Sequence, residues 1–174
     1  MGLLAELSTQ FQLSTGKHEL SAGNFYRRLT QTDQDRVQKF VQAYEETLSE
    51  EGRSGVVIAV GGSVYKQHPR KDIDLVLFFD GISHDRPFNY LHWDIFRGLA
   101  QKALARSGEY ESKIYHPSHD GIYGLWIATG RIIAKPLNPQ STDFDLIRWN
   151  SDYERGWKNW QEGRPFAVLA ERSA

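Results

Sequence analysis

The chain has 174 residues, of which 40% are hydrophobic, and at this size one compact domain can bury a sizeable core. A formal net charge of -1 excludes a broad basic surface for gripping long nucleic acid, and the absence of cysteine excludes disulfide bonds and thiolate metal sites. No stretch approaches the roughly 20 apolar residues that span a bilayer, and Glu6 interrupts the start of the chain, so we expect a cytoplasmic protein without membrane contact.

Residues 1–30 have the least regular pattern in the chain. Polar pieces such as Ser8 to Gln10 and Ser14 to His18 are consistent with an N-terminal arm, a short strand or a partly disordered segment. No repeat, low-complexity tract or Pro- or Gly-rich linker divides the rest. We therefore expect an arm over residues 1–30 and one domain over residues 31–174.

A helix is predicted to begin near Thr32, which would cap it, and to end at the glycines Gly52 and Gly55. Apolar residues recur at spacings of three and four through this segment, as expected for one buried face. They are Val37, Phe40, Val41, Tyr44 and Leu48.

Two apolar runs follow, and both predict buried strands. Gly55 to Val60 leads into the corner Gly61-Gly62-Ser63, and Ile73 to Phe79 leads into the turn pair Asp80-Gly81. A second helix should come next, with Gly108 ending it. Its apolar face would be Leu91, Ile95, Leu99 and Ala103.

The C-terminal third is rich in β-forming residues, with strands predicted at 110–115, 122–128, 131–137 and 144–149 and a hairpin turn at Thr129-Gly130. A last helix is predicted from Ser151 to the breakers Gly163 and Pro165. Tyr153, Trp157 and Trp160 would share one face of it, packing on the core or, with Trp149, stacking on a base. The fold class expected is α/β in the sense of a two-layer α+β domain, a mixed sheet with helices packed on one face.

The acids Asp72 and Asp74 stand at the start of the second predicted strand. Alternate side chains of a strand face the same way, so the two carboxylates project together while Ile73 enters the core. Two neighbouring negative charges are costly unless a positive charge lies between them. Oxygen ligands suit Mg2+, with Mn2+ as the alternative, and the pair therefore predicts a divalent metal site.

The corner Gly61-Gly62-Ser63 predicts a phosphate-binding turn. Glycines let the backbone approach a phosphate, and Ser63 is placed to begin a short helix. Arg70 and Lys71, directly before the acid pair, would add positive charge for a leaving pyrophosphate. A simple turn is the alternative interpretation of the corner.

Taken together, Val60-Gly61-Gly62-Ser63 and Asp72-Ile73-Asp74-Leu75 resemble the signature of the nucleotidyltransferase superfamily of the DNA polymerase beta type. In size the chain is similar to its small single-domain members, the antibiotic nucleotidyltransferases and the minimal nucleotidyltransferases that pair with helical toxin partners. Only residues 64–71 separate Ser63 from Asp72, fewer than the family usually has, so the helix after the corner should be stunted.

The resemblance implies transfer of a nucleoside monophosphate from an NTP such as ATP to an acceptor hydroxyl, with two Mg2+ ions and release of pyrophosphate. Asp72 and Asp74 would bridge the metals, and a third acid on a later strand would complete the catalytic site. Asp145 is our prediction for that acid because it lies within an apolar run, whereas Asp143 follows Ser141-Thr142 and suits a turn.

The net charge of -1 favours a small molecule or a protein as the acceptor over long nucleic acid. We expect the acceptor cleft to be completed by the N-terminal arm or by another subunit, either in a homodimer or with a toxin-like partner. An inactive or antitoxin-like nucleotide-binding module, working by clasping a partner, is the alternative function. A third hypothesis is a metallohydrolase built on His116, His119 and Asp120, although Pro117 and the surrounding polar residues are also typical of an ordinary loop.

Overall fold

The computed structural model describes residues 2–10, 19–66, 72–80, 90–109, 131–133, 138, 140–148 and 165–174. Helices and strands within these ranges form a two-layer α+β fold, as the sequence predicted. No helix in these ranges is long and apolar enough to cross a membrane.

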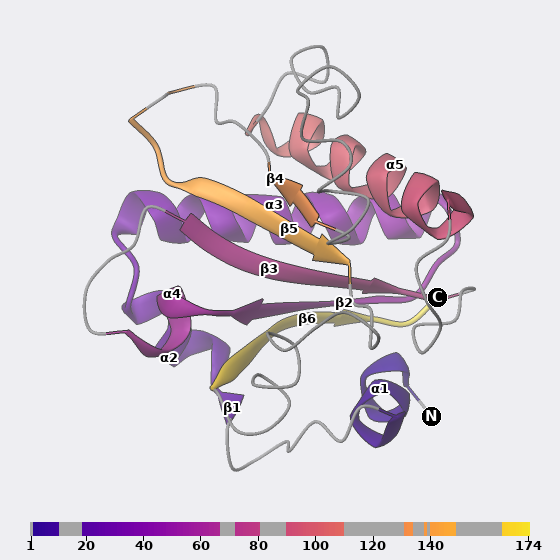
Figure 1. Cartoon of the computed structure of the whole chain (residues 1–174), viewed down its shortest axis with the longest axis horizontal. Helices are drawn as coiled ribbons and strands as arrows, with labels where there is room; N and C mark the ends of the chain where they lie inside the picture. Colours follow the sequence, from indigo (N-terminus) through magenta and orange to yellow (C-terminus); the bar gives the residue numbers. More distant parts are fainter. Residues whose placement is uncertain are drawn as a thin grey trace.

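The described strands form one mixed sheet in the order β1-β6-β2-β3-β5-β4 (Figure 1). β3 with β5 and β1 with β6 are parallel pairs, and the other neighbours are antiparallel. The strands are β1 (Glu19–Leu20), β2 (Gly55–Val60), β3 (Asp72–Phe79), β4 (Arg131–Ile133), β5 (Asp143–Arg148) and β6 (Phe166–Arg172).

Two long helices, α3 (Gln31–Glu50) and α5 (Tyr90–Ser107), pack against one another and cover one face of the sheet (Figure 1). Two short helices, α2 (Ala22–Arg27) and α4 (Gly62–Tyr65), add Phe25 and Val64 to the same core. The remaining helix, α1 (Leu3–Gln10), contacts the opposite face through Leu3 and Leu4. Helices therefore lie mainly, though not solely, on one face.

The predicted apolar stripe of α3 is confirmed, because all five of its residues are buried. Its predicted cap is wrong by two residues. Thr30, in an extended conformation, accepts a hydrogen bond from the Asp33 amide at 3.2 Å, and Thr32 lies inside the first turn. The start of α3 was misplaced because its first turn has no buried apolar residue, so the spacing of apolar residues does not mark where the helix begins. The predicted glycine stops are confirmed: Gly52 after α3 and Gly108 after α5 have φ of +63° and +75°.

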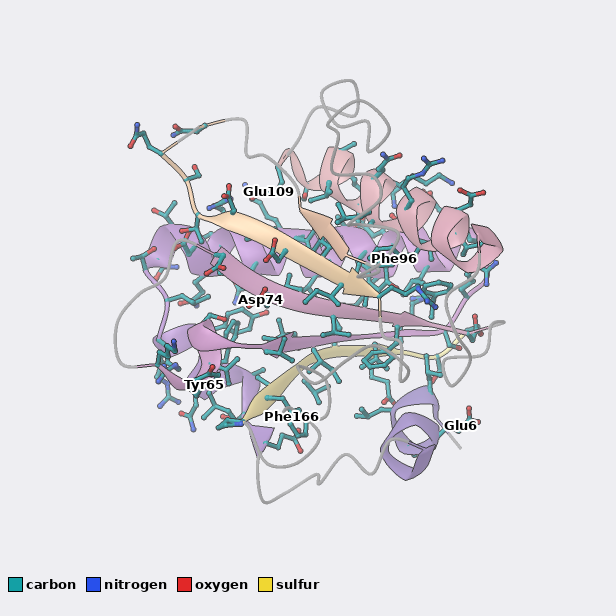
Figure 2. All side chains as sticks on the ribbon, viewed as in Figure 1. Glu6, Tyr65, Asp74, Phe96, Glu109 and Phe166 are labelled. Atoms are coloured by element: carbon teal, nitrogen blue, oxygen red, sulfur yellow. The ribbon has the colours of Figure 1, made fainter. Side chains whose placement is uncertain are left out.

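Buried apolar side chains form one hydrophobic cluster on each face of the sheet, which we call the helix-side cluster and the far-side cluster. Figure 2 labels Phe96, which belongs to the helix-side cluster, and Phe166, which belongs to the far-side cluster. Along β3, Ile73, Leu75, Leu77 and Phe79 enter the helix-side cluster, and Val76 and Phe78 enter the far-side cluster. Strand alternation therefore directs Asp72 and Asp74 to the far side of the sheet, away from α3 and α5.

β6, which lies between β1 and β2 in the sheet, was not predicted from the sequence. Its run from Phe166 to Ala170 lacks period-two alternation and is rich in Ala and Leu, which also suit helices. Antiparallel pairing with β2 makes it a strand. Among residues 1–30, the short strand was one of the expected alternatives, while α1 and α2 were not predicted; the boundary at residue 30 stays a prediction.

Several predicted elements fall partly or wholly outside the described residues. β4 and β5 account for the predicted strands at 131–137 and 144–149 as far as Ile133 and Arg148. The other two strands, the Thr129-Gly130 turn, the residue Gly81 and the helix from Ser151 lie outside the described ranges.

Candidate metal centre

Asp72 and Asp74 occupy the first and third positions of β3. Ile73, between them, is 1% exposed and anchors the strand in the helix-side cluster, so the two carboxylates stand together on the far side. Both acids are half-buried. The predicted convergence of the pair is confirmed.

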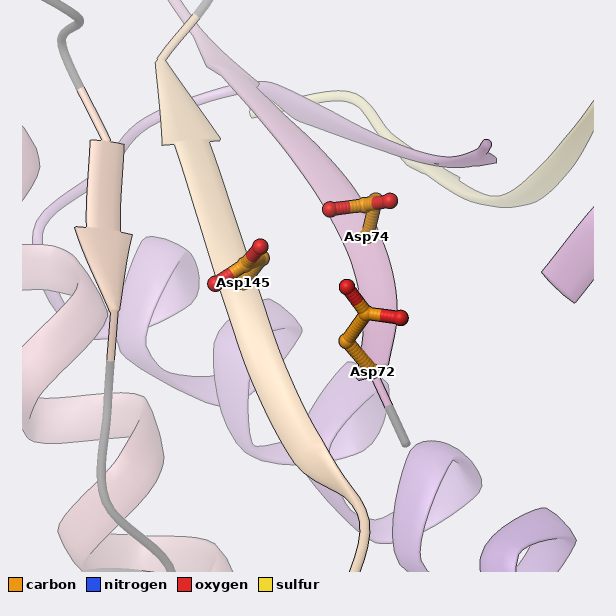
Figure 3. A group of neighbouring side chains, drawn as sticks. All are labelled: Asp72, Asp74 and Asp145. Carbon is orange, nitrogen blue, oxygen red and sulfur yellow. The ribbon is translucent and has the colours of Figure 1, made fainter. Parts of the chain in front are cut away.

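Asp145 joins the pair from the neighbouring strand. β3 and β5 run parallel in a register that sets Asp145 opposite Asp74. One carboxylate oxygen from each of Asp72, Asp74 and Asp145 lies within 4.8 Å of the other two, and Figure 3 shows the three side chains on the two adjacent strands. Asp145 is only 7% exposed, so its charge lies in a poorly hydrated position.

Asp143 stands opposite Asp72 in the same register but does not belong to that group of three. Burial raises the pKa of Asp143, and the carboxylates of Asp145 and Asp72 raise it further, while Arg36 opposes them. Negative charge is therefore concentrated where β3 and β5 begin. The geometry favours Asp145 over Asp143 as the third ligand.

Gly61 brings the corner after β2 into contact with the acids. Its φ of +76° and ψ of -160° are in a region that side chains essentially exclude. A Cβ built at this position would lie 2.4 Å from Oδ2 of Asp74, so a side chain here would be strained by the backbone and would also push the carboxylate aside. The two halves of the sequence motif are thus joined in space.

The helix after the corner is a single turn, Gly62–Tyr65, as the short spacer predicted. The Ser63 hydroxyl donates to the carbonyl of Val60 at 3.3 Å, which ties the turn back to β2. Arg28, at the end of α2, donates to the carbonyls of Ser63, at 3.1 Å, and Lys66. Arg28 could not be singled out from the sequence, because a lone arginine in a segment without regular pattern belongs to no motif.

The donor set of the group fits a hard divalent cation. Three carboxylates supply only oxygen atoms, and their spacing allows one ion to contact all three. A bound cation would also offset the mutual repulsion of the three charges. Among the described residues this is the group of acidic side chains whose geometry could hold a metal ion.

The other residues singled out in the sequence lie outside the described ranges. Arg70 and Lys71 are in one undescribed segment. His116, His119 and Asp120, the residues of the metallohydrolase hypothesis, are in another. The aromatic residues proposed for stacking are also outside. They are Trp149, Tyr153, Trp157 and Trp160.

Comparison of the chain with protein-family models, with curated proteins and with solved structures gave no match. The resemblance to nucleotidyltransferases therefore depends on the sequence motif alone.

Proposed function

We propose that this protein is a Mg2+-dependent nucleotidyltransferase that moves a nucleoside monophosphate from an NTP to an acceptor hydroxyl. The observation that carries the proposal is the meeting of three carboxylates beside a glycine corner, with Gly61 against Asp74. The acids predict metal binding and the glycine corner predicts phosphate binding, and the two lie side by side. Unrelated acids and turns would have no reason to meet in this way.

Asp72, Asp74 and Asp145 are the residues that would hold the metal. Bound Mg2+ supplies charge neutralisation for the phosphates and Lewis-acid assistance to the displacement. A one-turn helix has little dipole, so binding of the triphosphate at Gly61, Gly62 and Ser63 would depend on close backbone approach.

In the proposed reaction the acceptor oxygen forms a bond to the α-phosphorus of the NTP, and the bond from that phosphorus to the pyrophosphate oxygen breaks. The acceptor hydroxyl loses its proton, and Asp145 is the group we assign to orient the hydroxyl and to receive the proton. This is the role that the resemblance to nucleotidyltransferases implies for the third acid. Arg70 and Lys71, which directly precede the acid pair in the sequence, would supply positive charge to the leaving pyrophosphate.

The test is isothermal titration of the four NTPs with Mg2+ into the wild type and into Asp74→Asn. Asp94→Asn is the matched control, because Asp94 is a 63% exposed carboxylate on α5, outside the group of acids. Mg2+-dependent binding by the wild type and the control, lost in Asp74→Asn, is the expected result. No binding by the wild type would remove the nucleotide site and the proposal with it.

Turnover separates the enzyme from the alternative of a nucleotide-binding partner module. Release of pyrophosphate is measured with each NTP in the presence of panels of small hydroxyl compounds and of proteins. We expect release that depends on both Mg2+ and an acceptor. Tight NTP binding without turnover across both panels would favour the partner-binding module.

A further inference from the structure

The start of β5 is held by a cluster of polar contacts on the helix side of the sheet. Arg36, on α3, donates through Nη2 to the backbone carbonyl of Thr142 at 2.7 Å. The Thr142 hydroxyl donates to Oδ2 of Asp33 at 3.0 Å. The residue before β5 is therefore tied to the first turns of α3 through both its main chain and its side chain.

Arg36 is itself fixed from several directions. Its Nε and Nη2 donate to both carboxylate oxygens of Glu109, at the end of α5, over 2.7 to 3.2 Å, and its Nη1 donates to Asp33 at 3.1 Å. Its guanidinium also lies over the ring of Phe144, 4.9 Å from the centroid. The side chains of Arg36 and Glu109 are 14% and 8% exposed, so this ion pair is largely shielded from water.

These contacts bear on the metal centre through strand geometry. Arg36 contacts Thr142 and Phe144, which flank Asp143, and Phe144 packs edge-on against Phe40 in the helix-side cluster at 5.8 Å. Holding one side of a strand directs the alternate residues to the other side, and a slip of one residue would reverse them.

Among the described strands, the start of β5 has one pairing partner and its middle has two. β4 pairs with Asp145, Leu146 and Ile147, so Asp143 and Phe144 are paired by β3 alone among the described strands. The contacts of Arg36 with Thr142 and Phe144 add to the pairing of β5 with β3. They do so just before Asp145, and therefore help to fix its position opposite Asp74.

We propose that Arg36 is a positioning residue for the metal centre, which fixes the start of β5 so that Asp145 stays within reach of the ion bound by Asp72 and Asp74. This inference rests on the metal site of the proposed function but does not need the transfer reaction. It extends the site to a residue whose sequence position, on the helix that precedes β2, gave no sign of such a role.

Charge and position predict opposite results when Arg36 is replaced. Arg36 is near enough to Asp143 to attract its carboxylate, so loss of the positive charge by itself would tighten cation binding. Loss of the hold on β5 would weaken it, because Asp145 would no longer be kept in place. The direction of the change in metal affinity thus distinguishes the two effects.

The experiment measures the Kd of Mn2+, by electron paramagnetic resonance of free Mn2+, for the wild type, Arg36→Met and Arg36→Lys. Arg53→Met is the matched control. Arg53 lies after α3 rather than within it, but like Arg36 it lies over a phenylalanine, 5.9 Å from the Phe79 centroid, and donates to a carbonyl at the end of a strand, that of Asp80, at 2.8 Å. It does so at the end of β3 remote from the acids.

We expect a Kd about 10-fold weaker in Arg36→Met, in the range seen when groups that orient metal ligands are removed, and no more than about a twofold change in Arg53→Met. Arg36→Lys keeps the charge but cannot span Glu109 and the Thr142 carbonyl, so it should weaken binding as well. Circular dichroism establishes that each variant is folded at the temperature of the measurement.

Equal affinity in Arg36→Met and Arg53→Met, or tighter binding in Arg36→Met, would overturn the inference while leaving the metal site in place. If Arg36→Met does not fold, Arg36→Lys becomes the test, and a Kd for Mn2+ equal to that of the wild type would contradict the inference. A wild type that binds no Mn2+ would overturn both this inference and the proposed function. Mn2+ binding without nucleotide transfer would leave the inference standing and end only the proposed function.

Discussion

The two ends of β3 differ in almost every physical respect. At its start, half-buried Asp72 and Asp74 stand beside Asp145. At its end, Phe78 and Phe79 are fully buried, and the Tyr44 hydroxyl donates to the Phe78 carbonyl at 2.8 Å. The like charges at the start of β3 repel one another and disfavour folding, whereas burial of the apolar residues at its end favours folding. We infer that the stability of the fold is concentrated at one end and the capacity for a ligand at the other.

The largest effect expected from this comparison is the loss of apolar contact in Phe78→Ala. Removing a fully buried phenylalanine from the far-side cluster should lower the free energy of unfolding by about 3 to 5 kcal/mol, measured by urea denaturation. Asp72→Ala, on the same face of the same strand, should change it by no more than about 0.5 kcal/mol without metal. Comparable losses in the two variants would refute the division between the ends.

Metal should stabilise the acid end specifically. Added Mn2+ at about 100 times its Kd should raise the free energy of unfolding of the wild type by about 2.7 kcal/mol, because the ion binds the folded state. Thermal denaturation should show this gain in Asp143→Asn and not in Asp145→Asn, since Asp145 belongs to the group of three and Asp143 does not. The reverse pattern would identify Asp143 as the third ligand.

A smaller effect is expected from Tyr44→Phe at the closed end. The variant deletes the hydrogen bond to the Phe78 carbonyl in a fully buried place, and should cost about 1 to 2 kcal/mol in urea denaturation at neutral pH. Its Kd for Mn2+ should equal that of the wild type, because the hydroxyl is at the opposite end of β3 from the acids. Weaker Mn2+ binding would mean that the two ends are coupled.

The smallest effect concerns Tyr26, on α2 near the acid end, and is confined to alkaline pH. Burial, with a contribution from Glu45, raises the pKa of Tyr26 to about 12 from 10.0. The neutral phenol is thus favoured in the folded state. Its contribution to the free energy of unfolding is complete below pH 10 and is lost as the pH rises toward 12. Tyr26→Phe should leave stability at pH 7 nearly unchanged and make its decline between pH 10 and 12 shallower. An unchanged slope would contradict the assignment.

Much of the central architecture could be predicted from local patterns. The runs at Gly55 to Val60 and Ile73 to Phe79 are long, apolar and bounded by turn residues, and both proved to be strands with at most one residue of difference. The stripe of α3 and the stop at Gly108 were predicted for similar reasons. In each case the determining interaction lies within a few residues of the chain.

Contacts between distant segments could not be predicted in this way. The shared face of Asp72 and Asp74 and the glycine corner before them could be predicted, because strand alternation and backbone freedom are local properties. Asp145 was predicted as the third acid through the family resemblance and not from a local pattern. Its register opposite Asp74, the contact of Gly61 with Asp74 and the hold of Arg36 on the start of β5 became known from the folded chain. Register between strands and ion pairs between helices depend on how the whole chain packs, and no short stretch of sequence contains that information.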